Sequence, residues 1–253
     1  MSLKNTAVLN STAQRINSSL KNTSSKRARE PITRSRGKVR GQFPSTKMGR
    51  MIAWESQLER RACYLFEFCK AIEAFREQPI RLHIPFNDVI KRYTPDFELI
   101  LQTGEIWYVE IKPANKLQDL NLLAFYQAVA KELTSKGYTF VIITDQELNH
   151  PIREKNLVLL RRYQDTYLSK TLIARVTYWL NQRAISDLAE LVNYLGSYQL
   201  AYSLLAQGYL SFNLEQPLTN HTTIYHRLEN TDENRLFTGR TSPDFRPRAL
   251  YYR

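Results

Sequence analysis

Two acidic residues and a lysine stand at matched distances around a short turn, and this spacing restricts how the middle of the 253-residue chain can fold. Asp96 precedes the turn at Thr103-Gly104, and Glu110 and Lys112 follow it. β-Forming residues dominate both flanks, and such runs on either side of a glycine-containing turn favour a hairpin. We therefore predict an antiparallel hairpin over residues 94–112.

The register of this hairpin decides whether the three side chains meet. Asp96 and Glu110 each lie seven positions from Thr103, so a simple antiparallel register places them opposite each other, with Cβ atoms roughly 4.5–5.5 Å apart. Lys112 lies two residues beyond Glu110 and projects from the same face, because side chains alternate along a strand. Two carboxylates this close repel each other unless a cation lies between them. The pattern predicts a cation site beside a lysine.

These residue types suit the hydrolysis of a phosphodiester. That reaction needs a hydroxide near neutral pH and relief of charge on the phosphate oxygens, and a hard divalent ion supplies both. Oxygen ligands favour Mg²⁺ or Mn²⁺, which Asp96 and Glu110 would hold, while Lys112 would orient the attacking water or stabilise the transition state. The alternative is an exposed hairpin face with ordinary surface charges. The alternation of Phe97, Leu99 and Leu101 with polar positions favours a strand on this flank of the turn.

A third acid, Glu59, lies upstream in a predicted helix over residues 56–70. An apolar stripe recurs there at helical spacing: Leu58, Ala62, Leu65, Phe66 and Cys69. Glu59 borders this stripe and is a candidate third metal ligand. Ser56 precedes it by three positions, which is the spacing of a helix capping box, and a cap explains a glutamate there equally well. Both roles stay open for Glu59.

The remaining predicted elements complete an α/β arrangement. After the first helix they are a strand at 79–85, strands at 94–101 and 105–112, a helix at 119–136 and a strand at 138–144. This order, αβββαβ, resembles the restriction-endonuclease-like fold of the PD-(D/E)XK nuclease superfamily. Five motifs in order resemble more specifically the TnsA family, the endonuclease subunit of heteromeric bacterial transposases; they lie at residues 36–48, 54–59, 75–79, 93–97 and 109–113.

The resemblance covers most of residues 36–226 and implies a function. Glu59, Asp96, Glu110 and Lys112 match the catalytic positions of the family. The family cleaves the 5′ ends of a transposon, while an integrase-like partner, TnsB, cuts and joins the 3′ ends and an AAA+ regulator, TnsC, docks on the assembly. We therefore expect a Mg²⁺- or Mn²⁺-dependent endonuclease that acts on double-stranded transposon ends with these two partners.

The net charge of +12 is concentrated near the N-terminus. Residues 1–50 hold 12 Lys or Arg and one acidic residue, which leaves a net +1 for the rest of the chain. Because the segment is polar and lacks a sustained apolar period, we predict a flexible basic segment over residues 1–46. The cations nearest the first helix are expected to contact DNA phosphates: Arg34, Arg36, Lys38, Arg40, Lys47 and Arg50. The alternative is a solubilising tail.

Cysteine use and hydropathy bear on the compartment. Cys63 and Cys69 are the only cysteines, and with four scattered histidines they form no zinc motif. Their six-residue spacing places them on different faces of one helix, which disfavours a disulfide. Free cysteines fit a protein of the reducing cytosol. The sequence also contains no secretory h-region and no apolar run long enough to cross a bilayer. We expect a cytoplasmic bacterial protein associated with the nucleoid, without a membrane partner.

A second domain is predicted beyond the nuclease-like segment at 47–150. Residues 151–228 contain predicted helices near 172–180, 186–196 and 198–207 and strands at 209–214 and 222–228, an order that suggests a winged helix. Residues 184–226 contain no Lys or Arg, so we expect this domain to dock protein partners rather than DNA. Residues 229–253 suggest a flexible tail.

Two alternatives to a transposase subunit stay open. The chain could be a stand-alone restriction-like or junction-resolving nuclease, because that active site is shared across the superfamily. The scarcity of excess positive charge after residue 50 argues against this, since a solitary nuclease must hold DNA itself. It could also be a catalytically inactive, DNA-tethered adaptor, which the intact set of Glu59, Asp96, Glu110 and Lys112 argues against.

Overall fold

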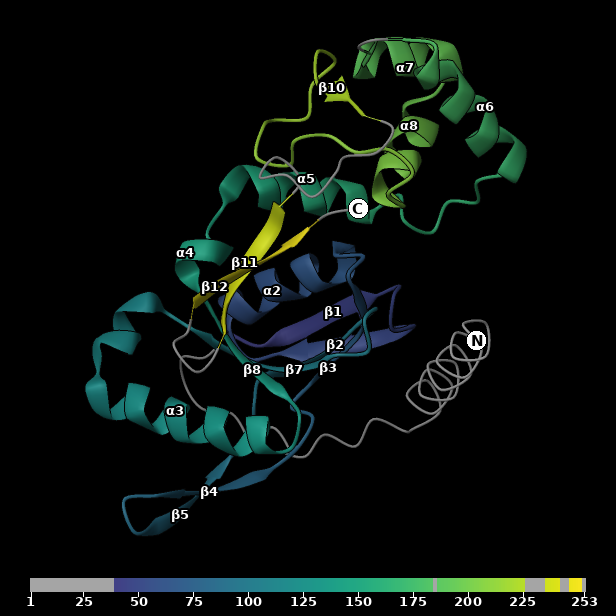
Figure 1. The fold of residues 1–253 in the computed structure, drawn as a ribbon. Helices are drawn as coiled ribbons and strands as arrows, with labels where there is room; N and C mark the ends of the chain where they lie inside the picture. The colour runs from purple at the N-terminus through teal and green to yellow at the C-terminus, as the bar shows by residue number, and fades with distance from the viewer. Residues whose placement is uncertain (1–38, 184–185, 226–234, 242–245, 252–253) are drawn as a thin grey trace, which may run out of the picture.

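A mixed β-sheet with helices on both faces forms the centre of the molecule (Figure 1). The computed structural model describes residues 39–183, 186–225, 235–241 and 246–251. The sheet has the strand order β12-β11-β8-β7-β6-β3, and only β7 and β8 pair in parallel. Its strands are β3 (Ile72–Glu77), β6 (Phe97–Leu101), β7 (Ile106–Lys112), β8 (Thr139–Thr144), β11 (Arg235–Thr241) and β12 (Arg246–Tyr251). The predicted α/β class is confirmed.

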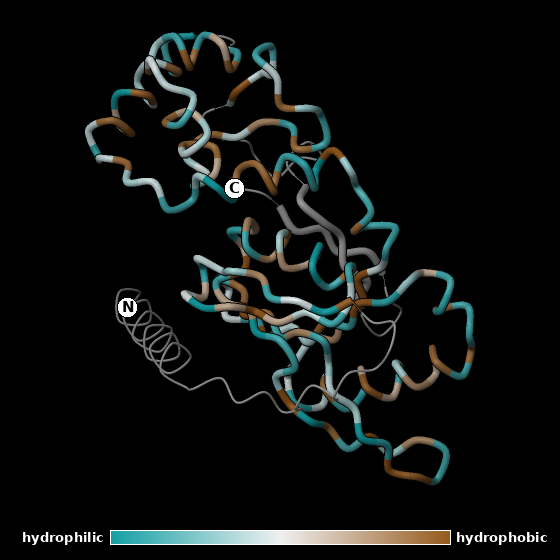
Figure 2. Tube along the Cα trace, turned by 180° about the vertical axis from the view of Figure 1, so that it is seen from behind, coloured by the Kyte–Doolittle hydropathy of each residue, from teal (hydrophilic) through white to brown (hydrophobic). Residues whose placement is uncertain are grey.

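Two helices cover the two faces of the sheet. Helix α2 (Gln57–Phe68) shares one hydrophobic core with Phe97 and Val109, whereas helix α3 (Leu120–Ser135) shares a second core with Tyr108 and Phe140. The hydrophobic residues in Figure 2 accordingly recur on the helices and strands between these layers. Because both faces are covered, every residue of β6 is buried. The predicted strand is present, and its complete burial disagrees with the alternative of an exposed hairpin face.

The strand expected at 79–85 does not join the sheet. Strand β3 takes that place beside β6, with Glu77 opposite Phe97. Residues 82–86 instead form β4 (Leu82–Phe86), which pairs only with β5 (Val89–Tyr93) in a separate two-stranded ribbon. Asn87 and Asp88 have φ of 50° and 59°, the left-handed conformation of a tight hairpin turn. The turn lets residues 82–86 pair with residues 89–93 of the same chain, in place of pairing with the central sheet.

A hairpin precedes α2 and crosses the expected boundary at residue 46. Strand β1 (Gly41–Ser45) pairs with β2 (Arg50–Trp54), and its Phe43 is buried against the α2 core. The folded domain therefore begins before position 46. The burial of Phe43, together with Ile52 and Trp54 of the same hairpin, explains the difference, because apolar side chains removed from water stabilise the hairpin on the core.

The C-terminal half is helical. After the 3₁₀ helix η1 (Ala114–Gln118), α3 and β8 come α4 (Asp145–Leu148), α5 (Pro151–Arg161), α6 (Lys170–Asn181), α7 (Leu188–Leu195) and α8 (Tyr198–Ala206). The three expected helices correspond to α6, α7 and α8. In place of the two expected long strands, β9 (Ser186–Asp187) pairs with β10 (Thr223–Ile224), and a single bridge joins Ser211 to Tyr225.

Helix α5 joins this half to the half that contains the central sheet. The core under α2 continues without a break through Leu157 and Leu160 of α5 into α6, α7 and α8. Polar contacts reinforce the junction: Asn156 Nδ2 donates to the carbonyl oxygens of Leu214 and Gln216 at 2.9 and 2.8 Å. The two halves therefore share one core instead of being separate folding units.

The segment expected as a flexible tail contributes β11 and β12. Strand β11 pairs antiparallel with β8 and extends the central sheet. The edge of β8 presents unpaired backbone groups, which a further strand satisfies. Among the residues that the structure describes, no helix is long and apolar enough to cross a membrane.

Candidate active site

The hairpin β6–β7 has the register that the sequence predicts. Phe97 pairs with Val109, and this register continues to bring Asp96 opposite Glu110 at the open end. Asp96 directly precedes β6, where the carbonyl oxygen of Asp96 accepts from the backbone N–H of Gln78 at 2.8 Å. Gln78 has a φ of 44°, so a left-handed residue at the end of β3 anchors the backbone of Asp96.

The carboxylate of Asp96 is fixed by the neighbouring strand. Its Oδ2 accepts from the backbone N–H of Ile111 at 2.7 Å. Burial raises the pKa of Asp96 well above its usual value, and the charges of Glu110 and Glu59 raise it further. The Ile111 N–H and Lys112 oppose this shift without cancelling it. Three acidic groups therefore converge closely enough to disfavour one another's charge.

Glu110 is buried and held by two tyrosines and the lysine. Tyr93 Oη donates to Glu110 Oε2 at 2.6 Å, and Tyr126 Oη donates to Oε1 at 2.9 Å. Lys112 Nζ lies 2.7 Å from the same Oε1, on the face that strand alternation predicts. Burial, followed by the charge of Glu110, raises the pKa of Tyr93 and of Tyr126, so both phenols stay protonated donors.

Sequence reasoning missed both tyrosines. Tyr93 was visible as the residue before Thr94-Pro95-Asp96, but Tyr126 comes from α3, and no local pattern links that helix to Glu110. For Lys112, burial alone would lower the pKa, yet Glu110, Asp96 and Glu59 outweigh burial and raise it. The lysine is therefore a firmly protonated cation within the acidic cluster.

Glu59 stands in the first turn of α2 and makes the contacts of a cap. Ser56 Oγ accepts from the Glu59 backbone N–H at 3.1 Å and donates to its Oε1 at 3.0 Å, while Oε2 accepts from the Glu55 N–H at 2.8 Å. Burial raises the pKa of Glu59, and the charges of Glu55 and Glu110 add to the shift. The cap is present, and the same carboxylate still lies within electrostatic range of Glu110.

The donor set suits a hard cation. Among the described residues, no three acidic, histidine or cysteine side chains are gathered as ready metal ligands, because Glu110 is turned to its tyrosines and Lys112. The carboxylates nevertheless raise the pKa of Asp96 and Glu59, and Glu55 Oε1 beside them is buried with no hydrogen-bond partner in the described chain. Converging oxygen ligands with surplus negative charge are what Mg²⁺ or Mn²⁺ binds.

Two of the expected DNA-contacting cations have structural partners instead. Lys47 Nζ donates to the carbonyl oxygens of Phe66, Cys69 and Ile72 at 2.6, 2.7 and 2.8 Å, which uses all three ammonium protons at the end of α2. Burial lowers the pKa of Lys47 to about 8. Arg50 forms a bidentate pair with Glu77, at 3.1 and 2.8 Å. Both cations are therefore held by groups of the fold itself.

The other predicted cations give less information. Arg40 precedes β1, and it has interactions of its own. Arg34, Arg36 and Lys38 lie outside the described residues.

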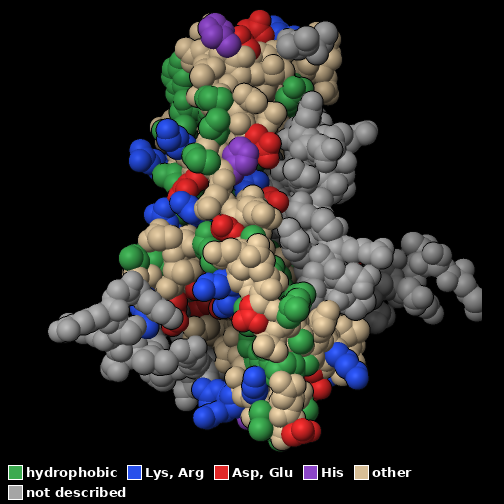
Figure 3. Space-filling view, turned by 90° about the vertical axis from the view of Figure 1, so that its left-hand side faces the viewer, with side chains coloured by type: hydrophobic (Ala, Val, Ile, Leu, Met, Phe, Trp, Pro, Cys, Tyr) green, Lys and Arg blue, Asp and Glu red, His purple; other side chains and the backbone are tan. Residues whose placement is uncertain are grey.

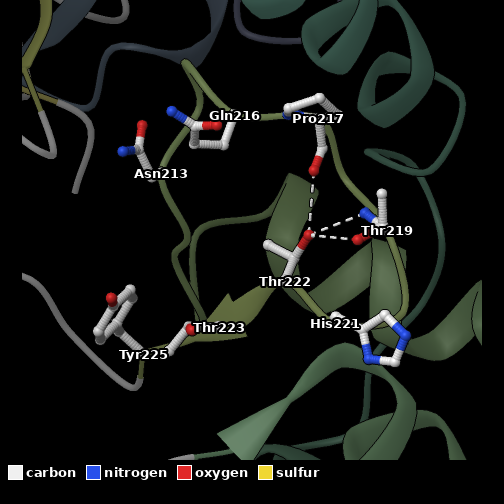
Figure 4. A pocket seen from close by; sticks show the side chains of 8 residues that line it. All are labelled: Asn213, Gln216, Pro217, Thr219, His221, Thr222, Thr223 and Tyr225. Atoms are coloured by element: carbon white, nitrogen blue, oxygen red, sulfur yellow. Dashed lines mark hydrogen bonds between the residues drawn. The ribbon is translucent and has the colours of Figure 1, made fainter.

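A hollow of roughly 430 Å³ in the C-terminal half is chemically different from this cluster (Figure 4). Its lining is amide and hydroxyl side chains of the loop before β10, and Thr222 Oγ1 there donates to the Pro217 carbonyl oxygen at 3.1 Å. His221 is the one ionisable side chain besides Tyr225 among its described lining residues, and it is 93% exposed. Such a site lacks the groups that hydrolysis needs.

Comparison with known proteins points to the same part of the chain as the geometry of the site does. Residues 69–145 match the family model described as TnsA-like endonuclease N terminal, a nuclease domain of the PD-(D/E)XK type. The match contains Asp96, Glu110 and Lys112, and it implies a nuclease with DNA as its substrate; nucleases of this type typically use a divalent metal. No curated protein matches the chain.

Proposed function

We propose that the protein is a Mg²⁺- or Mn²⁺-dependent DNA endonuclease whose site consists of Asp96, Glu110, Lys112 and Glu59. One observation carries the proposal: the hairpin register brings Asp96 opposite Glu110, with Lys112 beside them, inside the segment that matches the endonuclease domain. The raised pKa of Asp96, caused by burial and then by its acidic neighbours, supports a cation as the missing partner.

Asp96, Glu110 and Glu59 would hold the metal. When bound, such an ion lowers the pKa of a water and neutralises charge on the phosphate. Asp96 is presented for this role by the N–H of Ile111, and Tyr93 and Tyr126 orient Glu110. Lys112, 2.7 Å from Glu110, can turn its ammonium to the attacking water or to the charge that develops on the phosphate.

Cleavage of a plasmid that carries a transposon end, in the presence and absence of Mg²⁺ and with and without the integrase-like transposase and the ATPase, tests the proposal. Asp96→Ala should abolish strand cleavage, and chelation of the metal should do the same to the wild type. Lys170→Gln, an exposed change far from the site, is the matched control. Cleavage by Asp96→Ala at the wild-type rate would show that another site is responsible.

The two roles of Glu59 can be separated by Glu59→Gln. Glutamine can keep the capping contacts with Ser56 and Glu55 but is a poor ligand for Mg²⁺. Lost cleavage with an unchanged melting temperature supports the metal role. Retained cleavage with a lowered melting temperature would leave Glu59 as a cap only.

We further infer that this nuclease is the 5′-end-cleaving subunit of a heteromeric transposase of the bacterial cytoplasm. The resemblance of the motifs to the TnsA family supports this, and an integrase-like TnsB partner and an AAA+ TnsC partner follow from it. The three helices expected for a winged helix are present as α6, α7 and α8, the two-residue strands β9 and β10 stand in place of its two long strands, and residues 186–225 carry no Lys or Arg. This domain is the proposed protein-docking module.

Reconstitution tests the subunit role. The protein should cleave the 5′ side of a transposon end only when the integrase-like transposase and the ATPase encoded beside it are present. Co-purification of either partner with the full chain, and its loss after substitutions on exposed residues of α7 such as Tyr194→Ala, would support docking. Robust sequence-specific cleavage by the protein alone would instead favour a stand-alone nuclease.

A further inference from the structure

The two-stranded ribbon β4–β5 projects from the lower end of the molecule beside the candidate site (Figure 1). Its strands pair from Leu82↔Tyr93 to Phe86↔Val89 around the turn at Asn87 and Asp88. It forms a sheet of its own, separate from the central one. The ribbon is thus an appendage of the nuclease fold and not part of its core.

One face of the ribbon is fixed on α3. Leu82 and Ile84 are buried in the core that contains Tyr126. At the outer end, the Phe86 and Phe125 rings meet edge to face with centroids 5.4 Å apart, and Lys91 Nζ lies 4.5 Å from the Phe86 ring centroid. Because this face is anchored, the orientation of the ribbon relative to the site is set.

The opposite face is exposed, basic and partly apolar. His83 pairs with Arg92, and Pro85 pairs with Ile90, which is 71% exposed. Arg92 is the Lys or Arg that the two strands place on this face, with Arg81 just before β4, whereas Lys91 belongs to the anchored face and Asp88, the one acid of residues 81–93, is at the tip. At the lower end of the molecule, where the ribbon lies, Figure 3 shows Lys and Arg side chains near hydrophobic ones, with an acidic side chain at the very bottom.

The ribbon leads directly into the acidic cluster. Strand β5 ends at Tyr93, whose hydroxyl donates to Glu110 at 2.6 Å, and Asp96 follows three residues later. The base of the ribbon and the acidic cluster are therefore neighbours, so a molecule bound on the ribbon lies close to the site. For a nuclease, that molecule is the duplex next to the phosphate to be cut.

We propose that the β4–β5 ribbon lies in the major groove of duplex DNA beside the cleaved phosphate and positions the substrate. The inference rests on the proposed nuclease function and adds a binding element to it. The major groove is wide enough for a two-stranded β-ribbon. Arg81 and Arg92 contact the flanking phosphates, while Ile90 at the tip meets base edges. Arg81 and Arg92 give the exposed side of the ribbon a positive charge that suits DNA phosphates better than a basic or neutral protein surface.

Salt dependence of DNA binding is the first test. A short random-sequence duplex in metal-free buffer serves as the probe, and the full chain is used throughout. The slope of log K against log[salt] should fall by about 0.9 for each phosphate that a variant no longer neutralises, so by about 2 for Arg81→Gln/Arg92→Gln. Arg92→Gln alone should show half of this change. The control Lys170→Gln/Arg175→Gln removes two exposed cations from α6 and should leave the slope unchanged.

Disulfide cross-linking is the second test, and the chain is well suited to it. Cys63 and Cys69 are fully buried, so a cysteine introduced at an exposed position is the one accessible thiol. Ile90→Cys should form a cross-link to a duplex that carries thiol-tethered bases in its major groove. Tyr178→Cys, at a 69% exposed position on α6, should form none.

The outcomes separate this inference from the proposed function. If the ribbon variants bind and cross-link like their controls while wild-type protein cuts DNA and Asp96→Ala does not, the ribbon proposal is wrong and the nuclease stands. If ribbon variants lose DNA but no variant or wild type cuts with any divalent metal, with or without the integrase-like transposase and the ATPase, the nuclease proposal fails. Loss of a protein partner with unchanged DNA binding would make the ribbon a protein-docking strand and overturn the inference.

Discussion

The ionised carboxylate of Asp96 destabilises the folded state, because it is buried beside two other acidic side chains. Its unfolded pKa is about 3.9, and burial followed by Glu110 and Glu59 raises the folded pKa well above this. Below about pH 4 both states hold the proton, and the group has no net effect. As pH rises through the folded pKa, the folded state gives up a proton that it binds more tightly than the unfolded state does, so stability is lost.

Asp96→Asn should therefore be more stable than the wild type at pH 7 without metal. Asparagine can still accept the N–H of Ile111 but carries no charge. The stabilisation should disappear near pH 3, and Mg²⁺ should raise the melting temperature of the wild type more than that of the variant. Thermal unfolding across pH, with and without Mg²⁺, measures this; a variant that is less stable at pH 7 would contradict it.

Lys47 shows how a basic residue near a basic segment can have a purely structural role. Lys47→Met should lower the free energy of unfolding by about 1–3 kcal/mol, because three buried carbonyl oxygens at the end of α2 lose their donor. The salt dependence of DNA binding should not change. Urea unfolding and a salt titration measure the two effects. Unchanged stability with a reduced salt dependence of DNA binding would instead show that Lys47 contacts a DNA phosphate.

At the scale of elements, the hairpin β1–β2 depends on the absence of one side chain. A Cβ placed on Gly41 would lie 2.2 Å from Cζ2 and 2.7 Å from Cε2 of the Trp54 ring, across the pair that ends the hairpin. The ring is buried and rigid, so an added methyl group displaces it or the strand.

Gly41→Ala should cost about 1–3 kcal/mol through overpacking. Gln42→Ala, at an exposed position of the same strand, is the matched control and should be nearly neutral. Urea unfolding followed by tryptophan fluorescence measures both. Equal stability of the two variants would mean that the hairpin is not held against Trp54 as described.

At the scale of the whole molecule, the chain does not divide where its sequence suggests. Arg60 and Arg61 of α2 both pair with Glu154 of α5, at 2.6 and 3.0 Å, and the core beneath them is continuous. Removing residues 151–253 would expose apolar residues of α2 and the partner edge of β8. A truncation at 150 is thus expected to lower the melting temperature of the nuclease half, not only to remove a docking module.

Truncation at the N-terminus should give a sharp contrast. Deleting residues 1–38 should reduce DNA affinity and its salt dependence while leaving the melting temperature unchanged, because this segment holds all of the Lys and Arg before residue 51 except Arg40, Lys47 and Arg50. Deleting residues 1–46 should also unfold the hairpin, since it removes Phe43 from the core. Thermal unfolding of the two truncations decides; equal melting temperatures would contradict the boundary at β1.

Local patterns were enough for some features of this protein. The matched spacing around Thr103 sets the register of β6 and β7, because a hairpin with a short turn has few alternatives, and so places Asp96 opposite Glu110. The apolar stripe of α2 and the Ser56 cap follow from helical periodicity in the same way. Each depends on residues fewer than about 20 positions apart, whose geometry the backbone itself restricts.

Only the tertiary structure decided which distant groups share the site and which cations are used up in the fold. Tyr126 of α3 donates a hydrogen bond to Glu110, and Lys47 donates to carbonyl oxygens at the end of α2. Strand β3, and not residues 79–85, pairs with β6. These outcomes depend on which polar groups become hydrogen-bond partners when the helices and the sheet pack together. Burial makes an unpaired group costly, so the partner that the packed fold offers prevails over the role that local sequence suggests.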